Sequence, residues 1–502
     1  MTKPNILFIL TDQHRKDTLT AYGDVPCFTP NIDQLAEEST VFEQAYASCP
    51  ICTPARASIQ TGLYPMHHGM ITNSYNYGNM VQELPDTPEL LSRRLTEYGY
   101  QAGFTGKWHL GSGADNVRKD AYIQKFMGGI EFPEYQLQND AKPTTRGYVG
   151  DDFLGHGFGG HYYPQFQNAL KEQGKDFKIE NIIKNFYQQH QAGVVTTGVD
   201  STIEHYLVDR TMAVIDDFQK EEKPWYFQLN FWGPHEPYFV PEEYLAMYDD
   251  VELQPWENFQ EMSSDKPRIH DVKRGDFTSW KEIEPVVKHY LAGITHIDYQ
   301  IGRLIAYLKA NDLYDNTIII FSADHGESLG IHGGLCDKAI FMYEETNSIP
   351  LFLKATNQTN TQKVSQFINT CDIYSTILDY AGVAQAVRDR DGQSFRPLAE
   401  NQVIAWPETV VTECSGIGSI LFSQRMIRKG DWKYVFNCGD IDELYDLASD
   451  PYELDNKVEQ VAYTKALTEM RQALHEWMVA HNDNLIFEYE ALRMKKAGQA
   501  ND

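Results

Sequence analysis

NILFILTDQ, residues 5–13, is the stretch on which the fold prediction depends. Its apolar run predicts a strand buried on both faces, and the polar Thr-Asp-Gln follows where that strand stops. The same arrangement recurs at residues 101–104 before GKWHLG, at 225–231 before GPHEP and at 317–321 before SADHGE. We therefore expect four strands that each end in side chains able to carry chemistry.

Helical patterns separate these strands. They cover residues 87–98, 202–221 and 286–311, and the last shows apolar residues at a sustained helical period. Strands that alternate with helices predict an α/β fold with a large mixed, mostly parallel sheet sandwiched by helices. In such folds ligands bind beyond the carboxyl ends of the strands, which is where the polar ends fall.

The amino-acid composition differs in the segments outside this pattern of strands and helices. Residues 113–200 and 239–285 are rich in Gly, Tyr, Phe and Gln, and we interpret both as insertions over the rim of the sheet, where specificity usually resides. Short segments and a closing helix at 463–480 follow later in the chain. We expect a catalytic domain over residues 1–400 and a smaller α+β subdomain with an antiparallel sheet over 401–502.

Composition excludes several classes of function. The chain has 502 residues, 42 % of them hydrophobic, and a formal net charge of −28. This charge argues against nucleic acid and against anionic membrane surfaces, because both bind proteins through Lys and Arg. The longest early apolar run is too short for a membrane span or for the core of a secretion signal. The sequence as given predicts a cytoplasmic protein, or a periplasmic or secreted one if an export signal has been removed.

The stretch CTPARASIQTG, residues 52–62, raises the question of what Cys52 does. Free cysteine is often simply buried and structural. Cys49 and Cys52 have the spacing of a redox pair, although no short thioredoxin-like βαβ context surrounds them. A phosphatase-type thiolate needs a longer loop before its arginine than the three residues between Cys52 and Arg56. The residues alone leave these interpretations open.

The same stretch resembles the signature of the type I sulfatases of the alkaline-phosphatase-like superfamily. The resemblance extends through NILFILTDQ, TPNIDQLAEES, GKWHLG, PHEPY, VPEEY, HIDYQIGRL, SADHGESLG, DKAIFMYEE and DELYDLASDP, in order, from residue 4 to about residue 456. It implies a sulfuric ester hydrolase in which a formylglycine-generating enzyme converts Cys52 to formylglycine. One hydroxyl of the aldehyde hydrate attacks sulfur, and the other later expels sulfate.

The resemblance also implies a divalent metal site. Its ligands would be Asp12, Gln13, Asp324 and His325, together with position 52. Three of these four unmodified side chains offer oxygen, which favours Ca²⁺, with Mg²⁺ also possible. Gln13 stands where the family commonly has aspartate, and His325 where it often has asparagine.

The remaining site residues are implied to act on the diol, the sulfate or the departing alcohol. They are Arg56, which holds the diol and the metal carboxylates; Lys107, which binds sulfate; His109, which takes the diol proton; His235 and Lys338, which protonate the alcohol, with Lys338 also on the sulfate; and His332, which lines the substrate side.

A sulfated carbohydrate is the expected substrate, because aromatic, Gly-rich insertions suit sugar rings. A phosphonate monoester or phosphodiester hydrolase of the same superfamily is one alternative, but such enzymes tend to lack the GKWHLG element. A noncatalytic or redox protein that uses Cys49 and Cys52 is the alternative of another class.

Overall fold

The computed structural model of the chain describes all residues except 1–2, 75–78, 112–140, 154, 185, 188–189, 262–264, 276, 278, 359, 384–389, 419 and 495–502. Residues 113–140 of the predicted insertion at 113–200 therefore lie outside the described residues.

Eight strands form one large sheet in the order β11-β2-β10-β9-β1-β7-β3-β4. Their bounds are β1 Asn5–Asp12, β2 Thr40–Tyr46, β3 Gln101–Gly106, β4 Val149–Gly150, β7 Trp225–Pro234, β9 Thr317–Ala323, β10 Leu351–Lys354 and β11 Gln362–Asn369. Only β10 runs antiparallel to its neighbours in this sheet. The four predicted strands are β9, β1, β7 and β3, which lie side by side, and the prediction of a mixed, mostly parallel sheet is confirmed.

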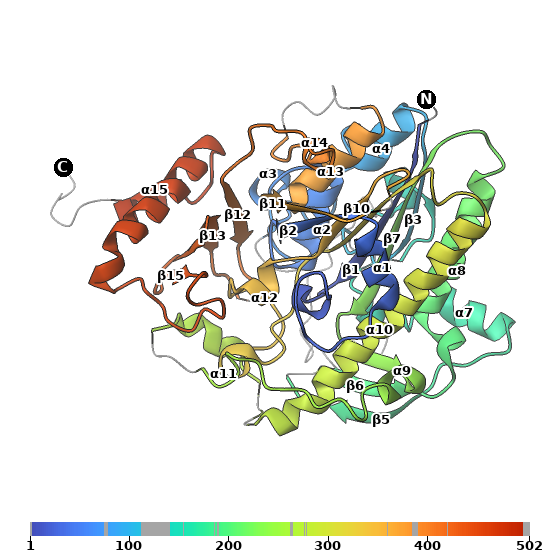
Figure 1. Cartoon of the computed structure of the whole chain (residues 1–502), viewed down its shortest axis with the longest axis horizontal. Helices are drawn as coiled ribbons and strands as arrows, with labels where there is room; N and C mark the ends of the chain where they lie inside the picture. Colours follow the sequence, from blue (N-terminus) through green and yellow to red (C-terminus); the bar gives the residue numbers. More distant parts are fainter. Residues whose placement is uncertain are drawn as a thin grey trace.

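Helices cover both faces of this sheet (Figure 1). In β1, Ile6 and Phe8 pack into one core, while Leu7 and Ile9 pack into the other. The first core contains α2 Cys52–Thr61, α4 Leu91–Glu97 and α13 Thr370–Tyr380. The second contains α1 Pro30–Glu37, α8 Ile203–Phe218 and α10 Trp280–Ala310. The three predicted helices correspond to α4, α8 and α10.

A separate antiparallel sheet follows late in the chain, at the left of Figure 1. It contains β12 Thr409–Cys414, β13 Gln424–Lys429, β14 Trp432–Asn437 and β15 Glu443–Asp446. Helix α15 Thr464–Ala480 packs on it through Met470 and Leu474, which share a core with Ile427 and Phe436. The expected sheet and closing helix are present, and the boundary near residue 400 stays a prediction.

A third sheet joins the two predicted insertions. It consists of β5 Ile179–Lys184, β6 Gln191–Val195 and β8 Tyr238–Pro241, with β6 parallel to β8. The composition of these segments did not predict it. Among the described residues, the remaining α-helices are α3 Pro65–His68, α7 Pro164–Glu172, α9 Glu242–Ala246, α11 Ile331–Gly334, α12 Glu344–Asn347, α14 Arg396–Ala399 and α16 Ile486–Tyr489.

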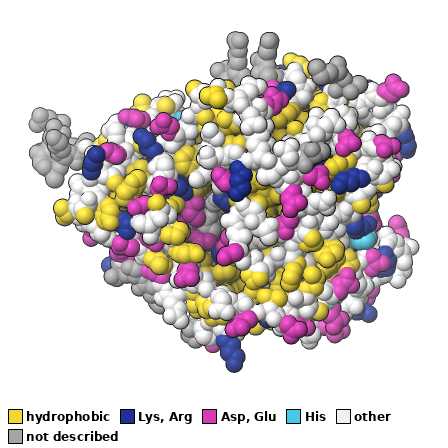
Figure 2. All heavy atoms as spheres, viewed as in Figure 1, with side chains coloured by type: hydrophobic (Ala, Val, Ile, Leu, Met, Phe, Trp, Pro, Cys, Tyr) yellow, Lys and Arg dark blue, Asp and Glu magenta, His cyan; other side chains and the backbone are white. Residues whose placement is uncertain are grey.

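The distribution of charged side chains on the surface agrees with the negative net charge of the sequence. Figure 2 shows Asp and Glu scattered over the face in view, without a continuous area of Lys and Arg on that face. Within the described part of the chain, no helix combines the length and apolar character needed to cross a bilayer.

Candidate active site

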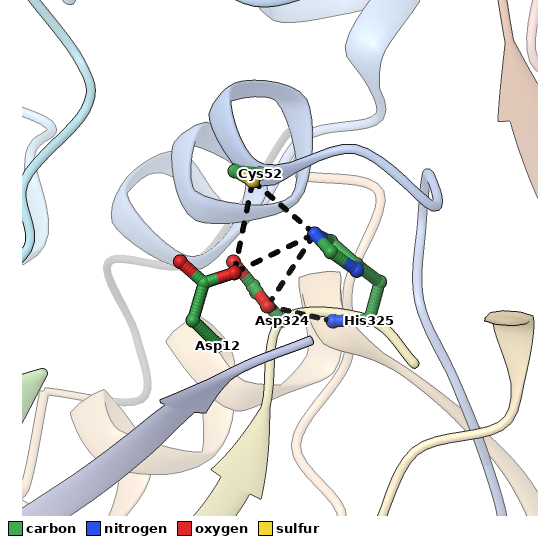
Figure 3. Close-up of side chains that lie close together, drawn as sticks. All are labelled: Asp12, Cys52, Asp324 and His325. Carbon is green, nitrogen blue, oxygen red and sulfur yellow. Dashed lines mark hydrogen bonds and ion pairs between the residues drawn. The ribbon is translucent and has the colours of Figure 1, made fainter. Parts of the chain in front are cut away.

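Cys52 lies at the start of α2, facing the ends of two neighbouring strands (Figure 3). Because β1 and β9 are parallel and paired, Asp12 at the end of β1 lies beside Asp324 and His325, which follow β9. One donor atom from each of these three residues and Cys52 Sγ all lie within 4.8 Å of one another, and all four residues are buried. Cys52 Sγ is 3.3 Å from His325 Nε2 and 3.7 Å from Asp12 Oδ1.

Gln13 approaches this cluster mainly through its backbone. Its backbone N–H donates to Asp324 Oδ1 at 3.0 Å, and its φ of 61° lies in the left-handed region that a non-glycine residue seldom adopts. The side-chain amide contacts Lys338 Nζ and Glu327 Oε2. Gln13 thus links the predicted metal ligands to Lys338.

Arg56 joins the two carboxylates from one helical turn away. Its Nη2 lies 2.9 Å from Asp324 Oδ2 and 3.2 Å from Asp12 Oδ2, and its Nη1 donates to the carbonyl oxygen of Lys107 at 2.9 Å. The helix begins at Cys52, so Arg56 lies about one turn further along it. Burial alone would raise the pKa of Asp12, but the charges of Lys107 and Arg56 hold it well below its usual value.

Lys107 and His109 reach the site by a route that the sequence did not predict. β3 ends at Gly106, before both residues, and His109 has a φ of 53°. The strand cannot continue through that backbone conformation. Lys107 Nζ nevertheless contacts Asp12 and lies 3.6 Å from Cys52 Sγ. Thr53 Oγ1 donates to the carbonyl oxygen of His109 at 2.6 Å, which holds that turn beside α2.

His235 and Lys338 form a pair near the same site. His235 Nδ1 lies 2.7 Å from the carbonyl oxygen of Glu236, so Nδ1 carries the proton and donates. His235 Nε2 is then the acceptor, 2.9 Å from Lys338 Nζ. Lys338 Nζ also contacts Gln13 Oε1 and lies 3.1 Å from Asp337 Oδ1. The two residues that were expected to act together therefore touch.

Burial determines the protonation of these groups. It raises the pKa of the Cys52 thiol to about 11, with Asp12 contributing, so the thiol is neutral near pH 7. Burial, with a nearby histidine or lysine, lowers the pKa of His109 and of His235 well below the usual value. Burial would also lower the pKa of Lys338, but nearby Asp337 raises it instead, so this side chain stays cationic.

His332 lies in a different cluster from the other predicted site residues. Its ring stacks on Tyr343 with centroids 3.7 Å apart, and its Nδ1 lies 2.8 Å from Glu261 Oε2. A turn with φ of 45° at His332 and 71° at Gly333 directs the chain there. The expected position on the substrate side is not supported by these contacts.

Glu327 and His156 also lie at this site, and neither is predicted from the sequence. Glu327 accepts from the backbone N–H groups of Leu329 at 2.9 Å and Asp337 at 2.7 Å, and contacts the Gln13 amide. It was visible within SADHGESLG but had no assigned role. His156 Nε2 lies 3.2 Å from His235 Nε2. It comes from the insertion at 113–200, where only composition had been interpreted.

The dithiol interpretation of Cys49 and Cys52 finds no support in the geometry. All seven cysteines are free, and Cys52 Sγ makes its contacts with Asp12, His325 and Lys107. Cys49 instead packs in a buried cluster with Ile51 and Cys414.

A large, mostly parallel sheet with acidic, basic and thiol side chains gathered at its strand ends defines an enzyme of the alkaline-phosphatase-like fold. A sequence profile described as Sulfatase matches residues 4–383, and a second, described as N-sulphoglucosamine sulphohydrolase, C-terminal, matches residues 330–480. The chain belongs to the sulfatase family and is a sulfuric ester hydrolase.

Three similar proteins illustrate this relationship. The N-acetylglucosamine-6-O-sulfatase of Bacteroides thetaiotaomicron is 27 % identical over 98 % of this chain and 89 % of its own length. A solved structure in complex with its substrate D-glucosamine-2-N,6-O-disulfate has a TM-score of 0.70 at 22 % identity, covering 96 % of this chain and 99 % of its own. The phosphonate monoester hydrolase of Agrobacterium radiobacter has a TM-score of 0.76 at 23 % identity, covering 95 % and 96 %. At these identities the two structures establish the fold alone.

Proposed function

We propose that this chain removes sulfate from a sulfated carbohydrate and that position 52, as formylglycine, carries the nucleophile. Asp12, His325 and Lys107 all contact Cys52 Sγ in a fully buried site, and this observation carries the proposal. Family membership supports the sulfate ester, and the relative named N-acetylglucosamine-6-O-sulfatase supports the carbohydrate.

The residues of the site fit both groups that the family implies, a formylglycine at position 52 and a divalent cation. A buried thiol with a raised pKa is a weak nucleophile, which favours conversion of Cys52 by a formylglycine-generating enzyme. Asp12, Asp324 and His325 converge on one point, with Gln13 beside them, and this largely oxygen-rich set suits Ca²⁺, or Mg²⁺ as the alternative. When present, formylglycine would supply the attacking oxygen and the cation would polarise the sulfate.

The cationic residues bind and orient the sulfate. Arg56 fixes the two carboxylates through contacts of 2.9 and 3.2 Å, so that they stay aligned next to position 52. Lys107 and Lys338 place two ammonium groups near Cys52 Sγ and are suited to hold the sulfate oxygens as charge builds on them. His109, neutral because of burial, is suited to accept a proton near position 52.

His235 and Lys338 serve the departing alcohol. The carbonyl oxygen of Glu236 holds His235 Nδ1–H, which leaves Nε2 directed at Lys338 Nζ. A proton delivered through this pair would neutralise the alkoxide as the ester bond breaks. The need for that proton is greatest for sugar alcohols, which are poor leaving groups.

Peptide mass spectrometry and ester assays test the proposal together. We expect formylglycine at position 52 after coexpression with a formylglycine-generating enzyme, and sulfate release from members of a panel of sulfated mono- and oligosaccharides. Phosphonate monoesters and phosphodiesters, assayed in parallel, should react with a lower kcat/KM. A preference for those esters would show that the enzyme is a phosphonate or phosphodiester hydrolase rather than a sulfatase. An unmodified thiol at position 52 in an active enzyme would show that formylglycine is not the nucleophile.

A further inference from the structure

His156 is a fourth histidine at the site, besides His109, His235 and His325, and it has no role in the proposed mechanism. Its ring centroid lies 4.7 Å from that of His235 and 5.0 Å from that of His109, with both pairs packed edge to face. His156 therefore stands between the proposed proton donor and the proposed proton acceptor.

The hydrogen bonds of His235 determine which atom His156 offers. His235 Nδ1–H is used by the carbonyl oxygen of Glu236, so His235 Nε2 must accept. His156 Nε2 lies 3.2 Å from that acceptor, which places the proton on His156 Nε2. The His156 N–H and the Lys338 ammonium, which lies 2.9 Å from His235 Nε2, thus face the same lone pair, and that lone pair accepts from one of them at a time.

The exposure of the three histidines indicates the direction from which substrate arrives. His109 and His235 are buried, at 2 and 6 % exposure, whereas His156 is only partly buried. Among the described residues, His156 is therefore the more open neighbour of the proposed acid, where the alcohol half of an ester would enter.

The backbone around His156 is held firmly enough to present this group. The indole N–H of the buried Trp232 donates to the carbonyl oxygen of His156 at 2.8 Å. Gly157 follows with a φ of 80°, and a Cβ there would meet Tyr163 at 2.4 Å. This turn therefore requires glycine, and it presses the segment against Tyr163.

We propose that His156 binds the alcohol half of the substrate: its Nε2–H leaves His235 Nε2, which then takes its hydrogen bond from Lys338 Nζ, and donates instead to a sugar oxygen near the departing one. The inference rests on the proposed function and adds a substrate-binding residue to it. The ligand chemistry is that of a polyol sulfate, because an aryl sulfate offers no hydroxyl to this donor. Binding, rather than proton transfer, is the role assigned.

Two variants of His156 and one control test this role. We would measure kcat and KM for His156→Ala, His156→Gln and His161→Ala on 4-nitrophenyl sulfate and on the panel sugar sulfate that the unsubstituted enzyme cleaves fastest. His161 is the matched control, since it lies in the same segment but stacks on Phe177 with centroids 4.6 Å apart. Thermal midpoints of all three variants report on folding.

For His156→Ala we expect kcat/KM on the sugar sulfate to fall about 10- to 100-fold, mainly through KM, with a much smaller loss on 4-nitrophenyl sulfate. His156→Gln should recover most of the sugar activity, because its amide N–H donates a similar bond. His161→Ala should affect the two esters equally.

Three results would overturn the inference: equal losses of His156→Ala on both esters, no loss on either, or a glutamine variant no better than alanine, which would indicate proton transfer. An unsubstituted enzyme that cleaves 4-nitrophenyl sulfate but no sugar sulfate would instead overturn the carbohydrate proposal, and His156 with it.

Discussion

His235 is the proposed proton donor to the departing alcohol, and two contacts hold its ring in one orientation. The carbonyl oxygen of Glu236 holds Nδ1, and Lys338 Nζ lies 2.9 Å from Nε2. His235→Ala should therefore lower turnover of sugar sulfates by about 10²- to 10⁴-fold and that of 4-nitrophenyl sulfate far less, since nitrophenolate needs no proton. Paired kcat measurements on the two esters check this. Equal losses would take the acid role away from His235.

Asp324 has two functions that one substitution should weaken together. It is a predicted metal ligand, and it pairs with Arg56 at 2.9 Å in a fully buried position. Asp324→Asn should lower both the bound Ca²⁺ per protein and the thermal midpoint, because the carboxylate charge is lost while the shape is kept. Elemental analysis and a melting curve with and without chelator measure the two effects. Unchanged metal content would assign the cation to other residues.

Apart from Lys338 and His332, the site residues that could be predicted from sequence share one property: they lie at or just after the end of a buried strand, or at the start of α2. Asp12 and Asp324 follow apolar runs, so the sheet itself brings them together. His156 comes from a Gly-rich segment without a repeating pattern, where no periodicity predicts which side chain turns inward. Composition likewise does not predict the left-handed turn at residues 332–333, which precedes the contacts of His332 with Tyr343 and Glu261.

The central strands were predictable and the outer ones were not, for a physical reason. Strands β1, β7 and β9 are covered on both faces, so nearly every position in them is buried. Each strand therefore shows in the sequence as a largely apolar run. Strands β2 and β11 carry partly exposed or exposed positions. Their mixed patterns do not separate them from loops, and the pairing that stabilises them lies far away in sequence.

A contact among α3, residue 391 and the end of α15 should make stability depend on pH. His67 Nδ1 lies 2.7 Å from Asp391 Oδ2, and this hydrogen bond raises the pKa of His67 to about 9. His67 Nε2 lies 2.7 Å from the carbonyl oxygen of His481. Because an unfolded histidine titrates near pH 6.5, the contact should stabilise the fold fully below about pH 6.5 and lose this contribution as pH rises through about 9.

The variant His67→Gln isolates this effect, since other groups titrate equally in both proteins. We expect the difference in urea midpoint between the two to be largest at pH 6 and to shrink by pH 9.5. A difference that stays constant over this range would show that the His67 charge does not contribute.

The late antiparallel sheet packs directly behind the segment that leads into α2. Met426 and Val435 share a buried cluster with Cys49 and Ile51. The backbone N–H of Glu413 donates to the carbonyl oxygen of Ser48 at 2.8 Å. The segment that leads to Cys52 is therefore supported by residues 365 or more positions later in the chain, and the two sheets depend on each other.

This shared core predicts that the whole chain unfolds in one transition. Met426 is fully buried in it, so Met426→Ala should destabilise the protein by about 2–5 kcal/mol and move the entire calorimetric peak to lower temperature. Met80→Ala is the matched control, because Met80 is 60 % exposed and its loss should cost less than about 0.5 kcal/mol. Two separate peaks, with Met426→Ala shifting only one, would instead mean that residues 401–502 unfold independently. A single shifted peak means that the support behind Cys52 cannot be lost without losing the fold.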